Sequence, residues 1–340
     1  EEITEVILSS ENISLQKGET KQIRATVLPL NASQEVTWVS GNESVVRVKD
    51  GLLTAVSSGT TTVAAVAKNG MIDKMRVSVQ YSPIDYEIGS NVMLYMYSDT
   101  LRVSLTKYDG YYLTRVWMAN PGNQIHKIGG LSLNTVPSMI GSAASAYDLN
   151  NKIVVAINGS GFHNYTFDND PQYNGTAIGN LVITEGQILR NNIGYEEHQW
   201  AKYYYYIINQ YGELKIAGNR SSEESHNNII NNIGAVNTFA FYPVYFADNE
   251  QWAIWNTGTA RRQGFCQIDG NNYAIVTSSM NGTLPMMNNI FINLGCKTAV
   301  NTDGGGSTSL LFKNRGQAFP GNVVIGGVRA VADTLFFTEG

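Results

Sequence analysis

Residues 1 to 80 alternate apolar and polar side chains in runs that are too short for helices. Turn sequences such as QKGET, SGNES and KDG separate these runs at close and regular intervals. Alternation with a period of two is typical of strands that bury one face. We therefore predict a small all-β sandwich here, with Trp38 filling part of its core. The runs that carry the pattern are 36–39, 45–48, 61–66 and 75–79.

A second, larger unit is predicted after this sandwich. Residues 81–98 are expected to form a linker and a leading strand, because Pro83 interrupts the strand pattern. Residues 99–340 are expected to form one domain, since no comparable break in composition follows. We therefore divide the chain into 1–80, the connecting segment 81–98 and 99–340.

Strand-like runs dominate the larger domain, and helical patterns are few. One helical pattern covers 138–149, and another begins after Thr283 as a suitable N-cap and ends at Gly295. Helices that are unevenly interspersed among strands favour an α+β domain with mixed β-sheets. The strand-like runs are 111–117, 152–157, 203–208 and 273–277.

Composition excludes several classes of partner. Charged residues make up 15% of the 340 residues, and the net charge is −5. Because no Lys or Arg run is longer than two, the chain lacks the basic footprint of a nucleic-acid-binding protein. No apolar run approaches the ~18 to 20 residues that a membrane span needs. We expect no nucleic-acid partner, no transmembrane segment and no signal peptide within this sequence.

The chain contains two cysteines, Cys266 and Cys296, and four histidines. They do not show the spacing of a Cys/His metal site, so we expect no zinc site and no cofactor. The two cysteines can form one disulfide or can stay separate as buried thiols. The sequence leaves both alternatives open.

Three consecutive glycines follow a carboxylate in AVNTDGGGSTSLLF, residues 299–312. A short apolar run leads to Asp303, then to Gly304–Gly306, and then to the hydroxyl residues Ser307 and Thr308. Glycines let a ligand approach the backbone closely, and their successive N–H groups can form an anion-binding concavity. The stretch lacks the Lys of a phosphate-binding P-loop. An alternative role for Asp303 is to cap the turn or to bind a cation.

Polar residues also follow or open other apolar strands. Asn158 ends the run KIVVAIN and Gly159 follows it, and Arg261 and Arg262 precede a strand. Arg329 opens the last strand of the chain. Arginine binds phosphate or carboxylate through a rigid, two-pronged guanidinium group. These residues are therefore candidates for binding an anionic ligand, and ordinary turn or surface roles are the alternative.

The sequence resembles two known families. Residues 1 to 80 resemble the bacterial Ig-like domain, group 2, in the stretch SLQKGET to GTTTVAAVA. The stretch from about residue 100 to residue 339 resembles the phosphodiester glycosidase family. Its matching motifs are VVAINGSGF, IGNLVITEGQI, FYPVYFADNE, Ala260-Arg261, AVNTDGGGSTSLLF and Arg329. The resemblance implies a hydrolase that cleaves the C1–O bond of a sugar-1-phosphodiester, similar to an N-acetylglucosamine-1-phosphodiester, into free sugar and a phosphate monoester.

The resemblance also implies roles for single residues. Asp303 is expected to be the principal catalytic carboxylate, as nucleophile or base, with Arg261 as a second catalytic residue. The expected substrate-binding residues are Asn158, Gly159, Asn180, Asn301, Gly304, Gly305, Gly306, Ser307, Thr308 and Arg329. A second carboxylate is not evident, and the candidates are Asp168, Asp170, Glu185 and Asp248. Whether Arg261 or Arg262 faces the site stays open.

Two other functions compete with this hypothesis. An inactive glycosidase-like domain that binds surface carbohydrate or wall polymers would also suit an Ig-like module. A phosphodiesterase that cleaves the P–O bond would need a metal cluster, and the scarcity of His and of clustered carboxylates speaks against one. The resemblance implies a secreted or cell-surface bacterial protein, with a sugar-phosphate or phosphodiester-linked glycan as substrate and a cell-wall polymer as a further candidate partner.

Overall fold

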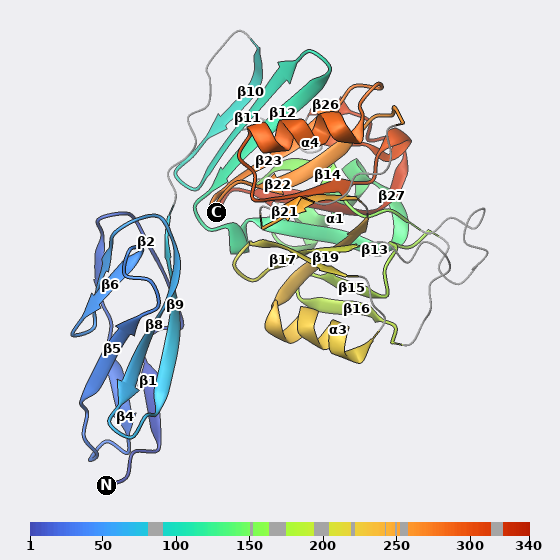
Figure 1. Cartoon of the computed structure of the whole chain (residues 1–340). Coiled ribbons are helices and arrows are strands. Elements are labelled where there is room, and N and C mark those ends of the chain that lie inside the picture. Colours follow the sequence, from blue (N-terminus) through green and yellow to red (C-terminus); the bar gives the residue numbers. More distant parts are fainter. Residues whose placement is uncertain are drawn as a thin grey trace. The chain divides into compact units, whose positions relative to one another are not determined.

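The computed structural model describes residues 1–80, 91–149, 152–162, 175–193, 204–218, 222–241, 243–248, 250–251, 258–313 and 322–340. The chain divides into two compact units, Glu1–Ser82 and Pro83–Gly340 (Figure 1). Each unit has its own buried apolar core.

The first unit is an Ig-like β-sandwich. A four-stranded sheet in the order β2-β9-β8-β5 and a three-stranded sheet in the order β3-β7-β6 accompany the pair β1-β4. Residues of both larger sheets meet in one core, which confirms the predicted sandwich, whereas Trp38 is only partly buried at its margin. The strands are β1 (Glu5–Leu8), β2 (Asn12–Leu15), β3 (Thr20–Gln22), β4 (Ala25–Leu28), β5 (Val36–Ser40), β6 (Val46–Lys49), β7 (Leu52–Ala55), β8 (Gly59–Ala67) and β9 (Ile72–Val79).

Two large sheets form the centre of the second unit. The eight-stranded sheet contains, in spatial order, β10 (Val92–Tyr97), β11 (Leu101–Tyr108), β12 (Tyr111–Met118), β23 (Asn272–Ser278), β22 (Gln263–Gln267), β24 (Thr298–Thr302), β20 (Val244–Ala247) and β21 (Glu250–Gln251). The five-stranded sheet contains β13 (Ile125–Thr135), β27 (Ala330–Thr338), β14 (Ile153–Asn158), β25 (Leu310–Phe312) and β26 (Asn322–Ile325).

Smaller elements complete this unit. A hairpin of β15 and β16 and a three-stranded sheet in the order β18-β17-β19 share a core with the short helix η2, which directly follows the short helix α3. The bounds of these elements are β15 (Leu181–Thr184), β16 (Gln187–Asn191), β17 (Tyr204–Asn209), β18 (Leu214–Gly218), β19 (Ala235–Phe241), α3 (Glu223–Asn227) and η2 (Asn228–Asn232). Two single turns are η1 (Pro121–Asn123) and η3 (Gly305–Ser307).

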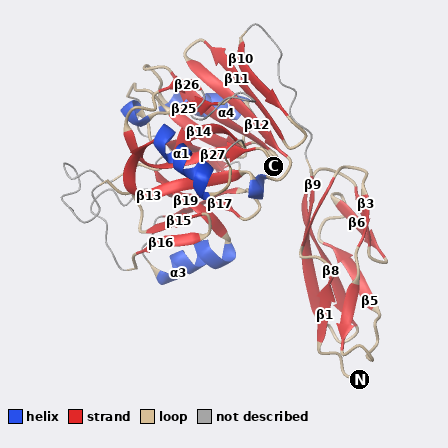
Figure 2. Cartoon of the chain, turned by 180° about the vertical axis from the view of Figure 1, so that it is seen from behind, coloured by secondary structure: helices blue, strands red, loops and turns tan. Residues whose placement is uncertain are grey.

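Two longer helices cover the outer faces of the large sheets. Helix α4 (Leu284–Asn293) is capped by the Thr283 side chain, as predicted, and buries Phe291 against the eight-stranded sheet. Helix α1 (Val136–Ala146) begins two residues before the predicted pattern and packs on β13, β14 and β27 (Figure 2). None of the described helices is long and apolar enough to cross a membrane.

The main core lies between the two large sheets. Side chains of the eight-stranded sheet, such as Val103, Ile275 and Val300, join Val155 and Phe337 of the five-stranded sheet in one buried cluster. The central strands β14, β23, β24 and β27 are buried along nearly their whole length, because α1 and α4 cover the outer faces of the sheets. Because the eight- and five-stranded sheets pack face to face, a segment that leaves one sheet can enter the other directly.

The second unit is mostly β, and the prediction of mixed sheets is wrong for the described strands. All strand pairs described in this unit are antiparallel. Antiparallel neighbours such as β11 and β12 need only a short turn, whereas parallel neighbours need a long crossover. Helix α4 provides such a crossover from β23 to β24, but β22 lies between these two strands.

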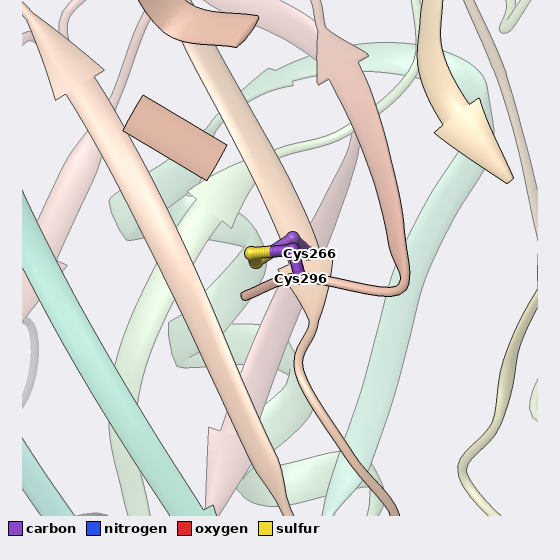
Figure 3. The surroundings of a disulfide bond; sticks show 2 residues. All are labelled: Cys266 and Cys296. Carbon is purple, nitrogen blue, oxygen red and sulfur yellow. A yellow bond between two sulfur atoms is a disulfide. The ribbon is translucent and has the colours of Figure 1, made fainter. Parts of the chain in front are cut away.

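A disulfide joins Cys266 on β22 to Cys296, which lies between α4 and β24 (Figure 3). Both cysteines are buried. Of the two alternatives that the sequence left open, the structure therefore has the disulfide. It ties the end of the α4 crossover to the sheet that the helix covers.

We expect the double variant Cys266→Ala/Cys296→Ala to lose about 3 kcal/mol of unfolding free energy, because the disulfide closes a long loop in the unfolded chain. The two cysteines are 30 residues apart. Urea unfolding with and without reductant measures the effect. Reductant should destabilise the wild type and leave the double variant unchanged; a wild type that ignores reductant under unfolding conditions would contradict the bond.

Candidate active site

The segment between β24 and β25, residues 303–309, carries the chain from one large sheet to the other, and we call it the glycine loop. Strand β24 of the eight-stranded sheet ends at Thr302, and Asp303 and Gly304 follow it. The turn η3 then leads into β25 of the five-stranded sheet. Asp303 thus lies at a crossing point, where loops from both sheets can reach it.

Contacts within the protein explain the glycines at 304 and 305. A Cβ atom on Gly304 would lie 2.8 Å from the carbonyl oxygen of Arg261, which is closer than real Cβ contacts allow. Gly305 has a φ of +59°, in the left-handed region, and its N–H donates to the same carbonyl oxygen at 2.8 Å. The glycines therefore let the loop pack against the main chain of Arg261.

Asn158 braces both ends of the glycine loop. Its Nδ2 donates to the carbonyl oxygen of Asp303 at 2.6 Å, and its Oδ1 accepts from the N–H of Ser309 at 2.8 Å. The N–H of Asp303 donates to the carbonyl oxygen of Gly159 at 3.0 Å. Asn158 is fully buried, so its amide has a structural role, and its predicted contact with a sugar stays a prediction.

Asp303 has an unusual electrostatic environment. The residue is half-buried, and desolvation of its carboxyl raises the pKa to about 6. Hydrogen bonds from the Ser307 hydroxyl and the Gly304 N–H and the charge of Arg329 lower this pKa, whereas the charge of Asp333 raises it. A carboxyl that titrates near pH 6 is a stronger base than an ordinary aspartate and is still largely ionised at neutral pH.

Arginines flank the loop on two sides. The exposed Arg329 stacks its guanidinium carbon 5.3 Å from the ring centre of Phe162 and lies beside Gly306. Arg261 is half-buried, and its Nε, like that of Arg262, has no hydrogen-bond partner among the described residues. Arg262 donates from Nη2 to the carbonyl oxygen of Gly258 at 3.0 Å. Both sides of the loop therefore carry positive charge, but which of the two adjacent arginines contacts a ligand stays open.

The other predicted substrate-binding residues lie in different surroundings. Asn301 is buried within β24, and its Oδ1 accepts from the Tyr245 hydroxyl at 3.1 Å. Thr308 is fully buried, and its Oγ1 has no hydrogen-bond partner among the described residues. Asn180 is buried next to β15, where its carbonyl oxygen accepts from the N–H of Asn192. The structure thus brings Thr308 into the glycine loop and places Asn180 on a separate hairpin.

A buried ion pair behind the loop was missed by the sequence analysis. Lys127 on β13 and Asp333 on β27 are both fully buried, and their Nζ and Oδ2 atoms are 3.1 Å apart. Both oxygens of Asp333 accept hydrogen bonds from Ser160 at 2.6 Å, one from its N–H and one from its hydroxyl. The available signal was a single charge within each of the apolar runs AVADTLFF and IHKIGG.

The proposed alternatives for a second carboxylate differ in position. Asp168 and Asp170 lie outside the described residues. Glu185 has a φ of +48° in a turn and binds His126 and the N–H of Lys127. Asp248 occupies an exposed turn with the same φ. Within the described ranges, no group of three or more His, Cys, Asp or Glu side chains is placed to hold a metal ion.

Fold and site together define a two-domain, β-rich protein whose second domain carries a carboxylate in a glycine loop flanked by arginines. The chain belongs to the phosphodiester glycosidase family, whose sequence model matches residues 151–338. A model of the bacterial Ig-like domain (group 2) matches residues 2–77. Both family resemblances predicted from the sequence are thereby confirmed.

Solved structures and curated proteins give further likenesses. The zebrafish N-acetylglucosamine-1-phosphodiester alpha-N-acetylglucosaminidase catalytic domain, auto-inhibited by its pro-peptide, has a TM-score of 0.47 at 13% identity, over 90% of this chain and 89% of that one. A hypothetical protein from Synechocystis has a TM-score of 0.42 at 13% identity, over 99% and 80%.

The curated relatives match over short stretches. Lacto-N-biosidase from Bifidobacterium bifidum is 44% identical over 68 residues, which is 20% of this chain. The minor capsid protein of Enterobacteria phage T3 is 33% identical over 76 residues, or 22% of this chain. The chain spans only 6% and 18% of the length of these two relatives.

Proposed function

We propose that the second domain hydrolyses the C1–O bond of a sugar-1-phosphodiester, such as an N-acetylglucosamine-1-phosphodiester, and releases free sugar and a phosphate monoester. The observation that carries the proposal is the Asp303 carboxyl, with a pKa of about 6, on a glycine loop whose Gly306 lies next to the guanidinium of Arg329. A basic carboxylate next to a cation suits a substrate with an anomeric carbon next to a phosphate. Membership of the phosphodiester glycosidase family supports this assignment.

Cleavage of the C1–O bond can be assisted by one strongly basic carboxylate. Cleavage of C1–O passes through a state with positive charge on the sugar ring, which a carboxylate stabilises as nucleophile or as the base that deprotonates water. The bonding electrons leave with the phosphate oxygen. Because a phosphate monoester has a second pKa of about 6, it departs with little need for protonation.

Phosphate binding is assigned to groups that can still accept a ligand. Arg329 is exposed beside the loop, and the Nε atoms of Arg261 and Arg262 have no partner among the described residues. Preorganised donors of this kind stabilise negative charge that develops on a leaving group. The loop amides, Ser307 and Thr308 are proposed to add further contacts to the phosphate. Asn158 and Asn180 are proposed to contact the sugar.

The cellular setting is proposed from the first domain. An Ig-like domain of group 2 supports a secreted or cell-surface location in a bacterium, with a phosphodiester-linked glycan as the substrate class. Cell-wall polymers carrying such links are candidate substrates. Binding of such polymers without cleavage is the alternative that the activity assay must exclude.

A product assay tests the proposal. Wild type and the exposed control variant Asp99→Asn are incubated with an N-acetylglucosamine-1-phosphodiester, with and without a chelator, and reducing sugar and phosphate monoester are measured. We expect equal amounts of both products, unchanged by the chelator and by Asp99→Asn. Lack of turnover on this and related sugar phosphodiesters would overturn the proposal and favour a polymer-binding protein.

The pH dependence follows from the pKa of Asp303. Because the ionised carboxylate is the active form, kcat/KM should rise as the pH increases through about 6 and then level off. Initial rates between pH 4.5 and 8, in buffers of constant ionic strength, measure the profile. A rate that falls as the pH rises through 6 would assign Asp303 as an acid and contradict its proposed role.

A further inference from the structure

The loop that follows β14 is held from two sides. On one side, Asn158 and Gly159 hold the main chain of Asp303, as described above. On the other side, the carboxylate of Asp333 accepts hydrogen bonds from the N–H and the hydroxyl of Ser160. The backbone carbonyl oxygen of Asp333 accepts from the N–H of Gly159 at 3.2 Å. Three consecutive residues, 158–160, therefore connect Asp333 to Asp303 by hydrogen bonds.

The Asp333 carboxylate is itself held in one position. Lys127 pairs with it, donates to the carbonyl oxygen of Thr238, and lies 4.8 Å from the ring centre of Phe239. The hydroxyl of Ser160 also accepts from the N–H of Ala240 at 3.1 Å.

There is little room around this contact. A Cβ atom on Gly159 would lie 2.5 Å from Asp333 Oδ1 and equally close to Phe239. A residue with a side chain at position 159 would therefore clash with this cluster.

A gain in folding stability does not by itself explain why Lys127 and Asp333 are buried together. Removing two charges from water costs several kcal/mol per ion, so a buried ion pair is often no more stabilising than apolar residues of similar volume. Geometric specificity is a role that buried charges can fill, and here the geometry that is fixed belongs to the loop behind Asp303.

We propose that Ser160, Asp333 and Lys127 form a positioning unit that fixes the main chain of Asp303 and thereby aims its carboxylate at the substrate. The effect on turnover rests on the proposed function, whereas the effect on the loop does not. Asp333 is a positioning residue, because its carboxylate is fully buried and both of its oxygens are bound within the protein.

The variant Ser160→Ala tests the unit with the smallest change. It removes one hydrogen bond to Asp333 and the acceptor of the Ala240 N–H, and it leaves the ion pair intact. Hydrogen exchange is measured by mass spectrometry on the peptide that contains the amides of Asp303 and Ser309. We expect these amides to exchange ~10-fold faster or more. We expect kcat to fall ~10- to 100-fold while KM changes less than about 2-fold, because misplaced catalytic groups slow the chemical step.

The matched control is Tyr273→Phe. It removes another buried hydroxyl, which donates to the carbonyl oxygen of Gly212 at 2.9 Å on a distant hairpin. Exchange at Asp303 and kcat should both stay at wild-type values. Unchanged exchange at Asp303 in Ser160→Ala would overturn the proposal, and so would raised exchange with an unchanged kcat. If the wild type shows no turnover, the proposed function fails, and the exchange result alone decides whether the unit positions Asp303.

Discussion

The variant Asp303→Asn should lose turnover of a sugar-1-phosphodiester, with kcat/KM reduced about 10³-fold or more. An amide has nearly the same shape as a carboxylate, and its one oxygen can still accept a hydrogen bond from the Ser307 hydroxyl or the Gly304 N–H. It cannot act as a base or as a nucleophile toward C1. The loss should therefore appear mainly in kcat, and Asp99→Asn should keep the wild-type rate.

The same variant should be more stable than the wild type above pH 6. The pKa of Asp303 is about 6 in the folded protein against an ordinary value of 3.8, so the folded state binds this proton more tightly than the unfolded state. The stability that the proton provides is complete below about pH 4 and is lost as the pH rises through about 6. Asn does not titrate, so the variant should gain up to about 3 kcal/mol at pH 8 and little at pH 4.

Urea unfolding of Asp303→Asn at pH 4 and pH 8 separates a catalytic from a structural role. A catalytic carboxylate in an unfavourable site should give an inactive and stabilised variant. If the variant is inactive and also less stable than the wild type at pH 8, then Asp303 caps the turn and the catalytic assignment is contradicted.

The variant Lys127→Met should be among the most destabilising single changes in the second domain. It leaves the fully buried Asp333 without a cation, which typically costs about 3–5 kcal/mol of unfolding free energy. The double variant Lys127→Met/Asp333→Asn removes both charges and should regain most of this loss. Urea unfolding of the wild type, both single variants and the double variant gives the coupling energy between the two residues.

The coupling energy between Lys127 and Asp333 distinguishes two outcomes. A large favourable coupling, with the double variant more stable than Lys127→Met, is expected. A double variant that loses the sum of the two single losses would mean that the two charges do not depend on each other, in contradiction to the observed contact. The control is the exposed Lys152→Met on the same domain, which should change stability little.

Local features of the fold were predictable because they depend on neighbouring residues. Alternating apolar residues marked β5 and β8, a strand-like apolar run marked β23, and the N-cap Thr283 marked the start of α4. Strand pairing depends on residues far apart in the sequence, so the mixed sheets were predicted wrongly. The bond between Cys266 and Cys296 also stayed undecided, because it requires β22 and the end of α4 to lie together.

The candidate site was predictable to a similar degree. The glycine run next to Asp303 marked a close approach to the backbone, but the structure shows that the carbonyl of Arg261 is one group that approaches. Lys127 and Asp333 escaped notice because a single charge in an apolar strand does not identify its partner. Only the pairing of β13 with β27 brings the two together.

The position of the cleaved bond tests the central claim most directly. An N-acetylglucosamine-1-phosphodiester is hydrolysed in water enriched in oxygen-18, and both products are analysed by mass spectrometry. The account predicts label in the C1 hydroxyl of the free sugar, unlabelled phosphate monoester, and neither product with Asp303→Asn. Label in the phosphate monoester and none in the sugar would show cleavage of the P–O bond and would contradict the account.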